Sequence, residues 1–238
     1  MESPEHFQLF GFAHGVTIAI ILALACVLAG IARNKKFQGW VNPISGILAI
    51  ILLSNEIIWW IAAVNLKLWS LKWGLPLQIC DLVIFASAYS LMRHRQWVWE
   101  LAYFWGLGGT LQAVLTPDMS FTFSHYYFFK FFITHGGVVI AVIFLAAGCG
   151  RPIYHCSIWR VFGITNIYAA LMGIFNWMTG ANYLYLCGKP RHPSILDHLG
   201  HWPWYILGLE AVLIISLFVY YLPFFIVERI TRKRKYDI

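Results

Sequence analysis

Long apolar stretches alternate with short polar connections along almost the whole chain. The apolar stretches fall at residues 8–32, 42–64, 76–92, 96–116, 127–148, 157–179 and 203–227. A helix needs about 20 apolar residues to cross the hydrocarbon layer, and helices are required because unpaired backbone groups are costly in lipid. The pattern therefore predicts an all-α fold, a polytopic membrane bundle of about seven transmembrane helices forming a single domain over residues 1–238.

The basic residues predict the orientation of these helices. Alternate connections place twelve of the seventeen Lys and Arg residues on one side of the membrane. These twelve are Arg33, Lys35, Lys36, Arg93, Arg95, Arg151, Arg160, Arg229, Arg232, Lys233, Arg234 and Lys235. Cytoplasmic loops carry an excess of Lys and Arg. We therefore expect the N-terminus outside the cell membrane, the C-terminus in the cytoplasm, and residues 229–238 as a basic cytoplasmic tail.

Composition supports a membrane protein and excludes several other classes. The chain is 60% hydrophobic and 11% charged, with a mean hydropathy of +0.69, which is more apolar than a water-soluble domain requires. Because topology explains the net charge of +7, membrane lipid is the expected partner and nucleic acid is not. Glu2 and Glu5 argue against a cleaved signal peptide, which would begin with basic residues. Five cysteines without a CxxC pair predict neither a disulfide framework nor a zinc finger, and no cofactor is expected.

Polar side chains in the apolar stretches or just beyond their ends gather at a similar predicted depth, in the outer half of the membrane. They are Asn55, Glu56, Gln78, Cys80, Asp81, Gln112, Thr116, Asp118, His135, Asn176, Asn182 and Glu210. Ionisable groups in lipid are costly and mark functional sites by default, so the set predicts a shared pocket open to the outside. The alternative for Asn55, Gln112 and Asn176 is that interhelical hydrogen bonds from these residues serve packing alone.

The two buried carboxylates, Glu56 and Glu210, need a cationic or protonated partner. His135 is the nearest candidate by predicted level. A Glu–His pair that only pins helices together is the alternative interpretation.

Cys80 and His135 are the candidate catalytic residues. Cys80 follows the helix start marked by Pro76, where the helix dipole favours a thiolate, and a nearby histidine would complete a nucleophile–base pair. Gly136, beside His135, allows another helix or a substrate to approach closely. Two alternatives stay open: Cys80 is a small buried hydrophobe, or it forms a disulfide with Cys187.

A loop rich in histidine precedes the last apolar stretch. It contains Asp197, His198 and His201, with His192 nearby, and His and carboxylate are suitable zinc ligands. The spacing matches no specific metal motif, so an exposed loop without metal is the favoured interpretation.

Several ordered motifs resemble a known family. They are Leu75–Asp81 (LPLQICD), Gly109–Asp118 (GTLQAVLTPD), the His135–Gly136 pair, Gly180–Tyr183 (GANY) and Asp197–Tyr205. The chain resembles the YwaF-like bacterial integral membrane proteins, whose animal relative is transmembrane protein 164. Where that family has Gly-Pro-Trp-Pro-Trp-Tyr before the last span, this chain has His201 in place of the first proline.

The resemblance implies a chemistry for two of the candidate residues. The animal relative is regarded as a phospholipid acyltransferase with a cysteine nucleophile at the position matched by Cys80. The chain is also distantly similar to serpentine lipid hydrolases, whose catalytic histidine is matched by His135. An activity carried over from a family in this way has only an associational basis.

Three functions are consistent with the sequence. The first is acyl transfer to, or hydrolysis of, a membrane lipid by a Cys80–His135 pair, with Gln78, Gln112 or Asn182 donating to the oxyanion. The second is binding or proton-coupled transport of a polar solute by the outer pocket. The third is a metal-dependent membrane hydrolase that uses the histidine-rich loop.

Overall fold

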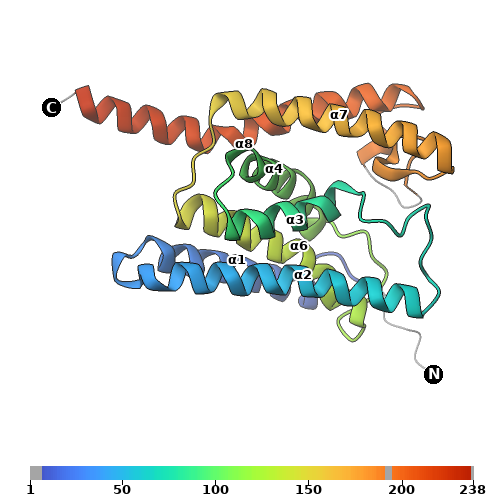
Figure 1. The fold of residues 1–238 in the computed structure, drawn as a ribbon, viewed down its shortest axis with the longest axis horizontal. Coiled ribbons are helices and arrows are strands. Elements are labelled where there is room, and N and C mark those ends of the chain that lie inside the picture. The colour runs from blue at the N-terminus through green and yellow to red at the C-terminus, as the bar shows by residue number, and fades with distance from the viewer. Residues whose placement is uncertain (1–6, 191–194, 237–238) are drawn as a thin grey trace. The chain divides into compact units, whose positions relative to one another are not determined.

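The computed structural model describes residues 7–190 and 195–236 (Figure 1). Within these residues the long elements are all helices, which confirms the predicted all-α class. The internal contacts divide the chain into two compact units, Met1–Arg151 and Pro152–Ile238. The predicted organisation as one domain stays a prediction.

The first unit contains most of the helices, and two of its turns are π-helical. Its elements are α1 (Phe12–Arg33), the 3₁₀ helix η1 (Lys35–Trp40), α2 (Val41–Asn65), α3 (Ile79–Met92), α4 (Gln96–Trp105), the π-helix η2 (Gly106–Leu111), α5 (Gln112–Leu115), α6 (Tyr126–Ile143) and the π-helix η3 (Phe144–Gly148). The second unit contains α7 (His155–Thr179), the 3₁₀ helices η4 (Tyr183–Tyr185) and η5 (Ile195–His198), and α8 (Trp204–Tyr236).

Five helical segments are long and apolar enough to cross a membrane. They are Phe12–Arg33, Lys35–Asn65, Tyr126–Gly148, His155–Thr179 and Trp204–Thr231. α3 has 14 residues and is about 21 Å long, less than the roughly 30 Å of a hydrocarbon layer. Residues 96–115 form one helical run whose middle is the π-helix η2. The predicted count of seven crossings and their orientation therefore stay predictions.

α1 and α2 both pack against α6, as Figure 1 shows for the α1, α2 and α6 ribbons. Glycines make this approach possible. A Cβ at Gly136 would lie 2.5 Å from Ile21 Cδ1 of α1, and one at Gly137 would lie 2.9 Å from Leu52 Cδ2 of α2. Neighbouring helices therefore approach closely at Gly136 and Gly137. Of the two roles predicted for Gly136, close approach of a helix or of a substrate, the structure shows the approach of a helix.

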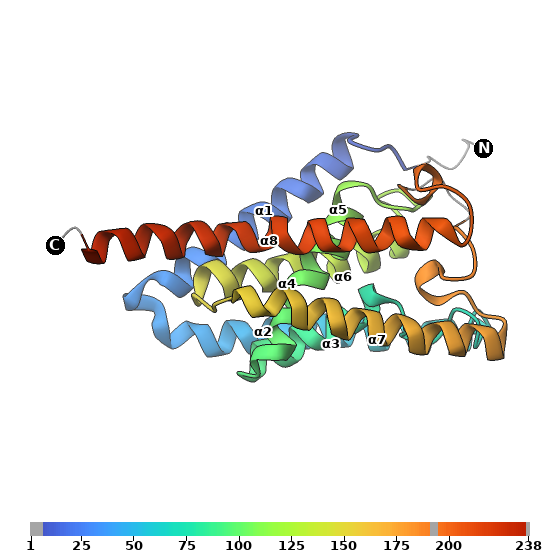
Figure 2. The same cartoon turned by 90° about the horizontal axis from the view of Figure 1, so that it is seen from above.

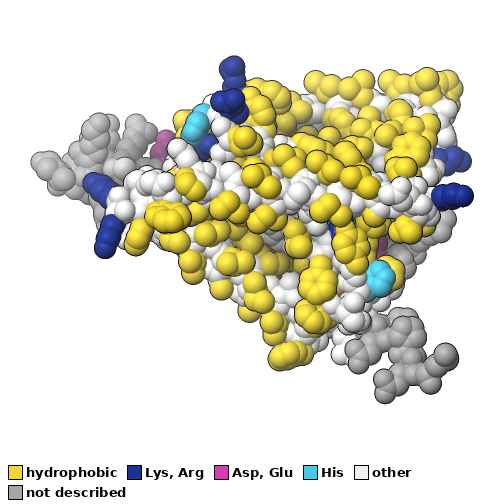
Figure 3. Space-filling model, turned by 60° about the horizontal axis from the view of Figure 1, so that its bottom comes forward, with side chains coloured by type: hydrophobic (Ala, Val, Ile, Leu, Met, Phe, Trp, Pro, Cys, Tyr) yellow, Lys and Arg dark blue, Asp and Glu magenta, His cyan; other side chains and the backbone are white. Residues whose placement is uncertain are grey.

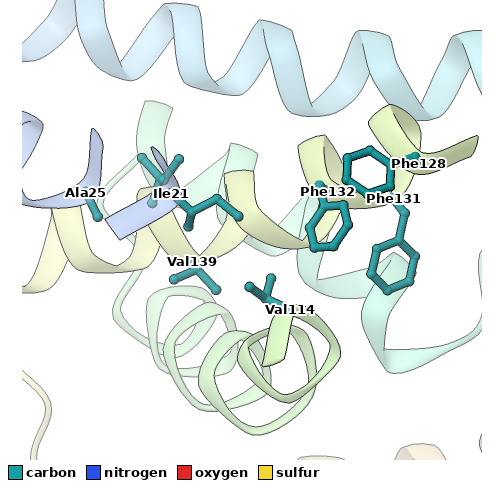
Figure 4. Close-up of a cluster of buried hydrophobic side chains, with 8 residues drawn as sticks. Ile21, Ala25, Val114, Phe128, Phe131, Phe132 and Val139 are labelled. Atoms are coloured by element: carbon teal, nitrogen blue, oxygen red, sulfur yellow. The ribbon is translucent and has the colours of Figure 1, made fainter. Parts of the chain in front are cut away.

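An apolar cluster fills the space between α1, α5 and α6 (Figure 4). Its buried members are Ile21, Ala25, Val114, Phe128, Phe131, Phe132, Val139 and Ile140. Membrane helices gain little from the hydrophobic effect in lipid, so close packing of this kind supplies much of their association energy. The cluster fixes α6, which carries His135, against its neighbours.

In the second unit, α7 and α8 pack against each other, and Figure 2 shows both as long helices. α7 ends at Gly180, whose left-handed backbone (φ 65°) suits glycine at a helix C-terminus. α8 carries Pro223 within its length and continues into the predicted basic tail; residues 237–238 lie outside the described residues.

Apolar side chains dominate the face drawn in Figure 3, where Lys and Arg side chains are few and lie towards its margins. Many large hydrophobic side chains are exposed, among them Phe12 at 90% and Trp177 at 84%. A water-soluble protein seldom exposes apolar surface on this scale, whereas a lipid-facing protein requires it.

Candidate functional site

Cys80 lies in the first turn of α3. The helix begins at Ile79 rather than at Pro76, because Gln78 has an extended backbone and is the N-cap residue. The backbone N–H of Gln78 donates to the Asp81 carboxylate at 3.2 Å. An acidic residue three positions after the N-cap satisfies a donor that would otherwise lack a partner. Cys80 thus occupies the helix turn in which exposed N–H groups favour a negative charge.

The sulfur of Cys80 faces a glycine of the π-helix η2. A Cβ at Gly109 would lie 3.5 Å from Cys80 Sγ, an ordinary van der Waals distance, so the thiol packs beside this turn. One turn away, a Cβ at Gly106 would lie 3.0 Å from Val142 Cγ2 and 3.2 Å from Val138 Cγ1 of α6. π-helical turns are uncommon and frequently occur at functional sites.

These contacts give the relative direction of η2 and α6. A Cβ at Gly106 would meet Val138, and Val114, further along the same helical run, packs with the earlier residues of α6. η2 and α6 are therefore antiparallel. His135 precedes Val138 by three residues in α6, and Gly109 follows Gly106 by three residues in η2. The proximity of His135 to Cys80 stays a prediction.

His135 has a defined tautomer. Its Nδ1 lies 2.9 Å from the Phe131 carbonyl oxygen, which can only accept, so Nδ1 carries the proton. The ring also stacks on the Phe131 side chain, with 4.1 Å between centroids. Nε2 therefore presents a lone pair, as a general base requires. Within the described part of the chain, no hydrogen bond joins His135 to Cys80.

A second buried histidine, His14 of α1, is used differently. Its Nδ1 accepts from the Phe10 backbone N–H at 3.0 Å, and its Nε2 donates to the Val114 carbonyl at 2.8 Å. Both ring nitrogens are thus occupied by backbone groups. His14 is structural, whereas His135 keeps one nitrogen for chemistry. Sequence reasoning missed His14, although a lone histidine in an apolar stretch was the available signal.

Glu56 pairs with Lys130 rather than with His135, the partner predicted from sequence. Lys130 Nζ lies 3.3 Å from Glu56 Oε2, and the two side chains are only 11% and 3% exposed. The prediction failed because only His135 was considered as the partner of Glu56, although Lys130 lies within the predicted stretch 127–148 and within α6, which begins at Tyr126. Lys130 also lies over the Trp59 ring, 5.5 Å from its centroid.

The ion pair with Lys130 joins Glu56 of α2 to α6. The structure thus pairs Glu56 of the predicted set with a lysine that sequence reasoning did not select. A site shared by Glu56, Cys80, Asp81 and His135 stays a prediction.

Several predicted binding residues are engaged by nearby groups. Asn55 donates to Thr134 Oγ1 at 2.8 Å and to the Lys130 carbonyl, so it joins α2 to α6 and serves packing. Gln112 is exposed and donates to the Thr116 hydroxyl at 2.7 Å. Gln112 lies on α5, one turn beyond Gly109. The side-chain amide of Gln112 therefore bonds to a neighbouring residue at the end of its own helix.

The predicted residues of the second unit organise their own loop. Asn176 is buried, donates to the Tyr183 carbonyl and accepts from its N–H, at 2.8 and 2.9 Å. Asn182 makes the same kind of pair with the backbone of Gly188 and Cys187. These amides are structural groups of the loop after α7, so an oxyanion role for Asn182 is not supported.

Glu210 of α8 is half-buried and accepts from Asn166 Nδ2 of α7 at 3.0 Å. The partner predicted for Glu210 was a cationic or protonated group, and the contact found is an amide. A pocket shared by Glu210 and the residues of the first unit stays a prediction. Sequence reasoning also missed Glu100 of α4, which is fully buried and accepts from Gln96 Nε2 at 3.1 Å.

Two alternatives remain to be compared with the structure: a disulfide between Cys80 and Cys187, and a metal site in the histidine-rich loop. All five cysteines are free thiols, and Cys187 is exposed. His198 and His201 are exposed, and His192 lies outside the described residues. Residues 7–190 and 195–236 contain no group of three or more His, Cys, Asp or Glu side chains placed to hold a metal ion.

Together these features define a helical membrane protein with charged and nucleophilic side chains placed among its helices. A family model for the TMEM164 family matches residues 3–221, and the chain belongs to that family. This confirms the relation to transmembrane protein 164 that the sequence motifs predicted.

One relative among curated proteins is an uncharacterized protein of Treponema pallidum (strain Nichols), 28% identical over 154 residues. The match covers 63% of this chain and 62% of the relative, so the chain spans less than two thirds of that protein's length. No solved structure matches the chain.

Proposed function

We propose that this protein transfers or hydrolyses acyl groups of lipids in the cell membrane, with Cys80 as nucleophile and His135 as general base. The proposal is supported by His135 Nε2, which is left as an acceptor because Nδ1 donates to the Phe131 carbonyl. The Cys80 sulfur lies beside Gly109 of the π-helix η2.

The reaction would begin when the Cys80 sulfur attacks the ester carbonyl carbon and its proton passes to His135 Nε2. A carbon–sulfur bond forms, and the carbonyl oxygen becomes an oxyanion. The carbon–oxygen ester bond then breaks, and the leaving alkoxide takes the proton from His135. Attack of a second lipid hydroxyl, or of water, on the resulting thioester releases the thiol and gives the transferred or free acyl group.

Labelling with a thiol-reactive, lipid-like acyl probe tests this proposal. The purified protein, Cys80→Ala, His135→Ala and the control Cys187→Ala would be treated with the probe and mapped by mass spectrometry. We expect modification of Cys80 that is retained in Cys187→Ala and suppressed in His135→Ala. Full lipid-remodelling activity in Cys80→Ala would refute the proposal.

A second candidate function is proton-coupled transport or binding of a polar solute. It is favoured by one observation, the buried ion pair of Glu56 and Lys130, because charged groups within a membrane protein commonly mark ion or solute pathways. Proton-dependent uptake into proteoliposomes would support this function. Uptake that is unchanged in Glu56→Gln would count against it.

A further inference from the structure

Three arginines belong to two connections that lie side by side in the first unit. Arg93 and Arg95 lie in the short connection between α3 and α4, and Arg151 follows the π-helix η3. Arg151 Nη1 donates to the Arg93 carbonyl oxygen at 3.3 Å, so the guanidinium lies beside a residue 58 positions earlier in the chain. The backbone of Arg151 is fixed as well, because its N–H donates to the Leu145 carbonyl at 3.0 Å.

These arginines lack a negatively charged partner. Within residues 7–190 and 195–236, none of the three forms an ion pair with an acidic side chain. Positive charges gathered in this way repel one another, and the repulsion is stronger where lipid lowers the local dielectric constant. An anion bound among the arginines would replace this repulsion by attraction.

The Arg151 guanidinium also has an N–H group without an acceptor. Nη1 is used by the Arg93 carbonyl, whereas Nε is buried and has no hydrogen-bond partner in the described part of the chain. Nε and Nη2 together form one edge of the guanidinium, and such an edge binds two oxygens of a phosphate or carboxylate in parallel. Arg151 as a whole is only half-buried, so an acceptor from outside the protein can reach its guanidinium.

The predicted location of this edge favours phosphate. The charge rule predicts that both connections face the cytoplasm, where the phosphate groups of anionic lipids lie at the membrane surface. We infer that Arg151, Arg93 and Arg95 form a binding site for a phosphate group. Arg151 holds two phosphate oxygens through Nε and Nη2, while Arg93 and Arg95 add positive charge from the neighbouring connection. The site is independent of the chemistry proposed for Cys80.

The rival explanation is that these arginines only orient the helices, as basic residues on the cytoplasmic side commonly do. Orientation depends on charge and not on one edge of a guanidinium. Arg151→Lys therefore separates the two explanations, because it keeps the charge and removes the edge. Lys35→Gln is the matched control for Arg151→Gln, since Lys35 is an exposed basic residue on the same predicted side.

Thermal unfolding of the full-length protein in a neutral detergent would measure binding, because a ligand of the folded state raises the unfolding temperature. The probes are phosphatidylglycerol, phosphatidylcholine and inorganic phosphate, each titrated separately. We expect phosphatidylglycerol to stabilise wild type and Lys35→Gln equally. Its apparent Kd should be about tenfold weaker for Arg151→Gln, which loses charge-assisted hydrogen bonds, and weakened by a smaller factor for Arg151→Lys. Phosphatidylcholine should stabilise less, because its choline group neutralises its phosphate.

The two sources of phosphate give different results. Stabilisation by phosphatidylglycerol alone identifies a lipid headgroup as the ligand, whereas stabilisation by inorganic phosphate that is weakened in Arg151→Gln identifies a soluble phosphate. Equal affinities of wild type and Arg151→Gln for both probes, or the same weakening in Lys35→Gln, would overturn the inference. Should Arg151→Gln fail to fold, Arg93→Gln combined with Arg95→Gln keeps the backbone carbonyl that holds Arg151, and an unchanged affinity there overturns the inference as well.

Discussion

Replacing Gly136 by alanine tests the packing that holds α1 against α6. The new Cβ would lie 2.5 Å from Ile21 Cδ1 and 2.8 Å from Ile21 Cγ1, well inside van der Waals contact. Ile21 is 6% exposed and β-branched, so its rotamer is stiff and cannot turn away freely. Overpacking of this kind costs about 1–3 kcal/mol, while glycine to alanine in a helix gains about 1 kcal/mol. We expect a net loss of up to about 2 kcal/mol.

Thermal unfolding in detergent, followed by size-exclusion chromatography of the soluble fraction, would measure the effect. Gly30→Ala is the matched control, because a Cβ there meets nothing within 4 Å, and it should be neutral or stabilising. In an Ile21→Ala background the clash disappears, so Gly136→Ala should then cost nothing further. If Gly136→Ala is as stable as Gly30→Ala, or if its cost persists in the Ile21→Ala background, the packing argument is wrong.

Three further outcomes follow from the described contacts. Asn176→Ala removes both hydrogen bonds to the Tyr183 backbone and leaves buried groups unsatisfied. We expect the free energy of unfolding to fall by about 1–3 kcal/mol and the loop after α7 to be cut faster by proteases. Unchanged proteolysis would contradict this. Asn55→Leu removes the bond to Thr134 and should cost about 0.6 kcal/mol, typical of interhelical bonds in membranes, with a loss above 3 kcal/mol pointing to another role. A membrane-impermeant maleimide should label the exposed Cys187 in intact cells, whereas labelling only after permeabilisation would reverse the predicted orientation.

The sequence was sufficient to predict the helical class because the length of each apolar stretch relates directly to membrane thickness. It also predicted Cys80 and Asp81 in the first turns of a helix, and α3 begins at Ile79. Sequence could not predict how far each side chain reaches. Lys130 was counted among the basic residues of the outer side, and only the structure shows its ion pair with Glu56.

The amide side chains were the least predictable part of the site. The sequence shows that Asn176 lies near the end of a helix. It does not show that the backbone of the following loop folds back and hydrogen-bonds to the Asn176 side chain. The π-helical turn at Gly106–Leu111 could not be predicted either. One widened turn rotates the glycines to another face of the helix but leaves the apolar pattern of the sequence unchanged.

The hydrogen bond from His14 to the Val114 carbonyl has a consequence for biosynthesis. It joins groups 100 residues apart, and the last carbonyls of a helix otherwise lack partners. α1 is synthesised before the helix that ends at Leu115, so the His14 ring gains this acceptor only once the later helix has been made. The packing of α1 in this unit is therefore completed only after residue 114 has been synthesised.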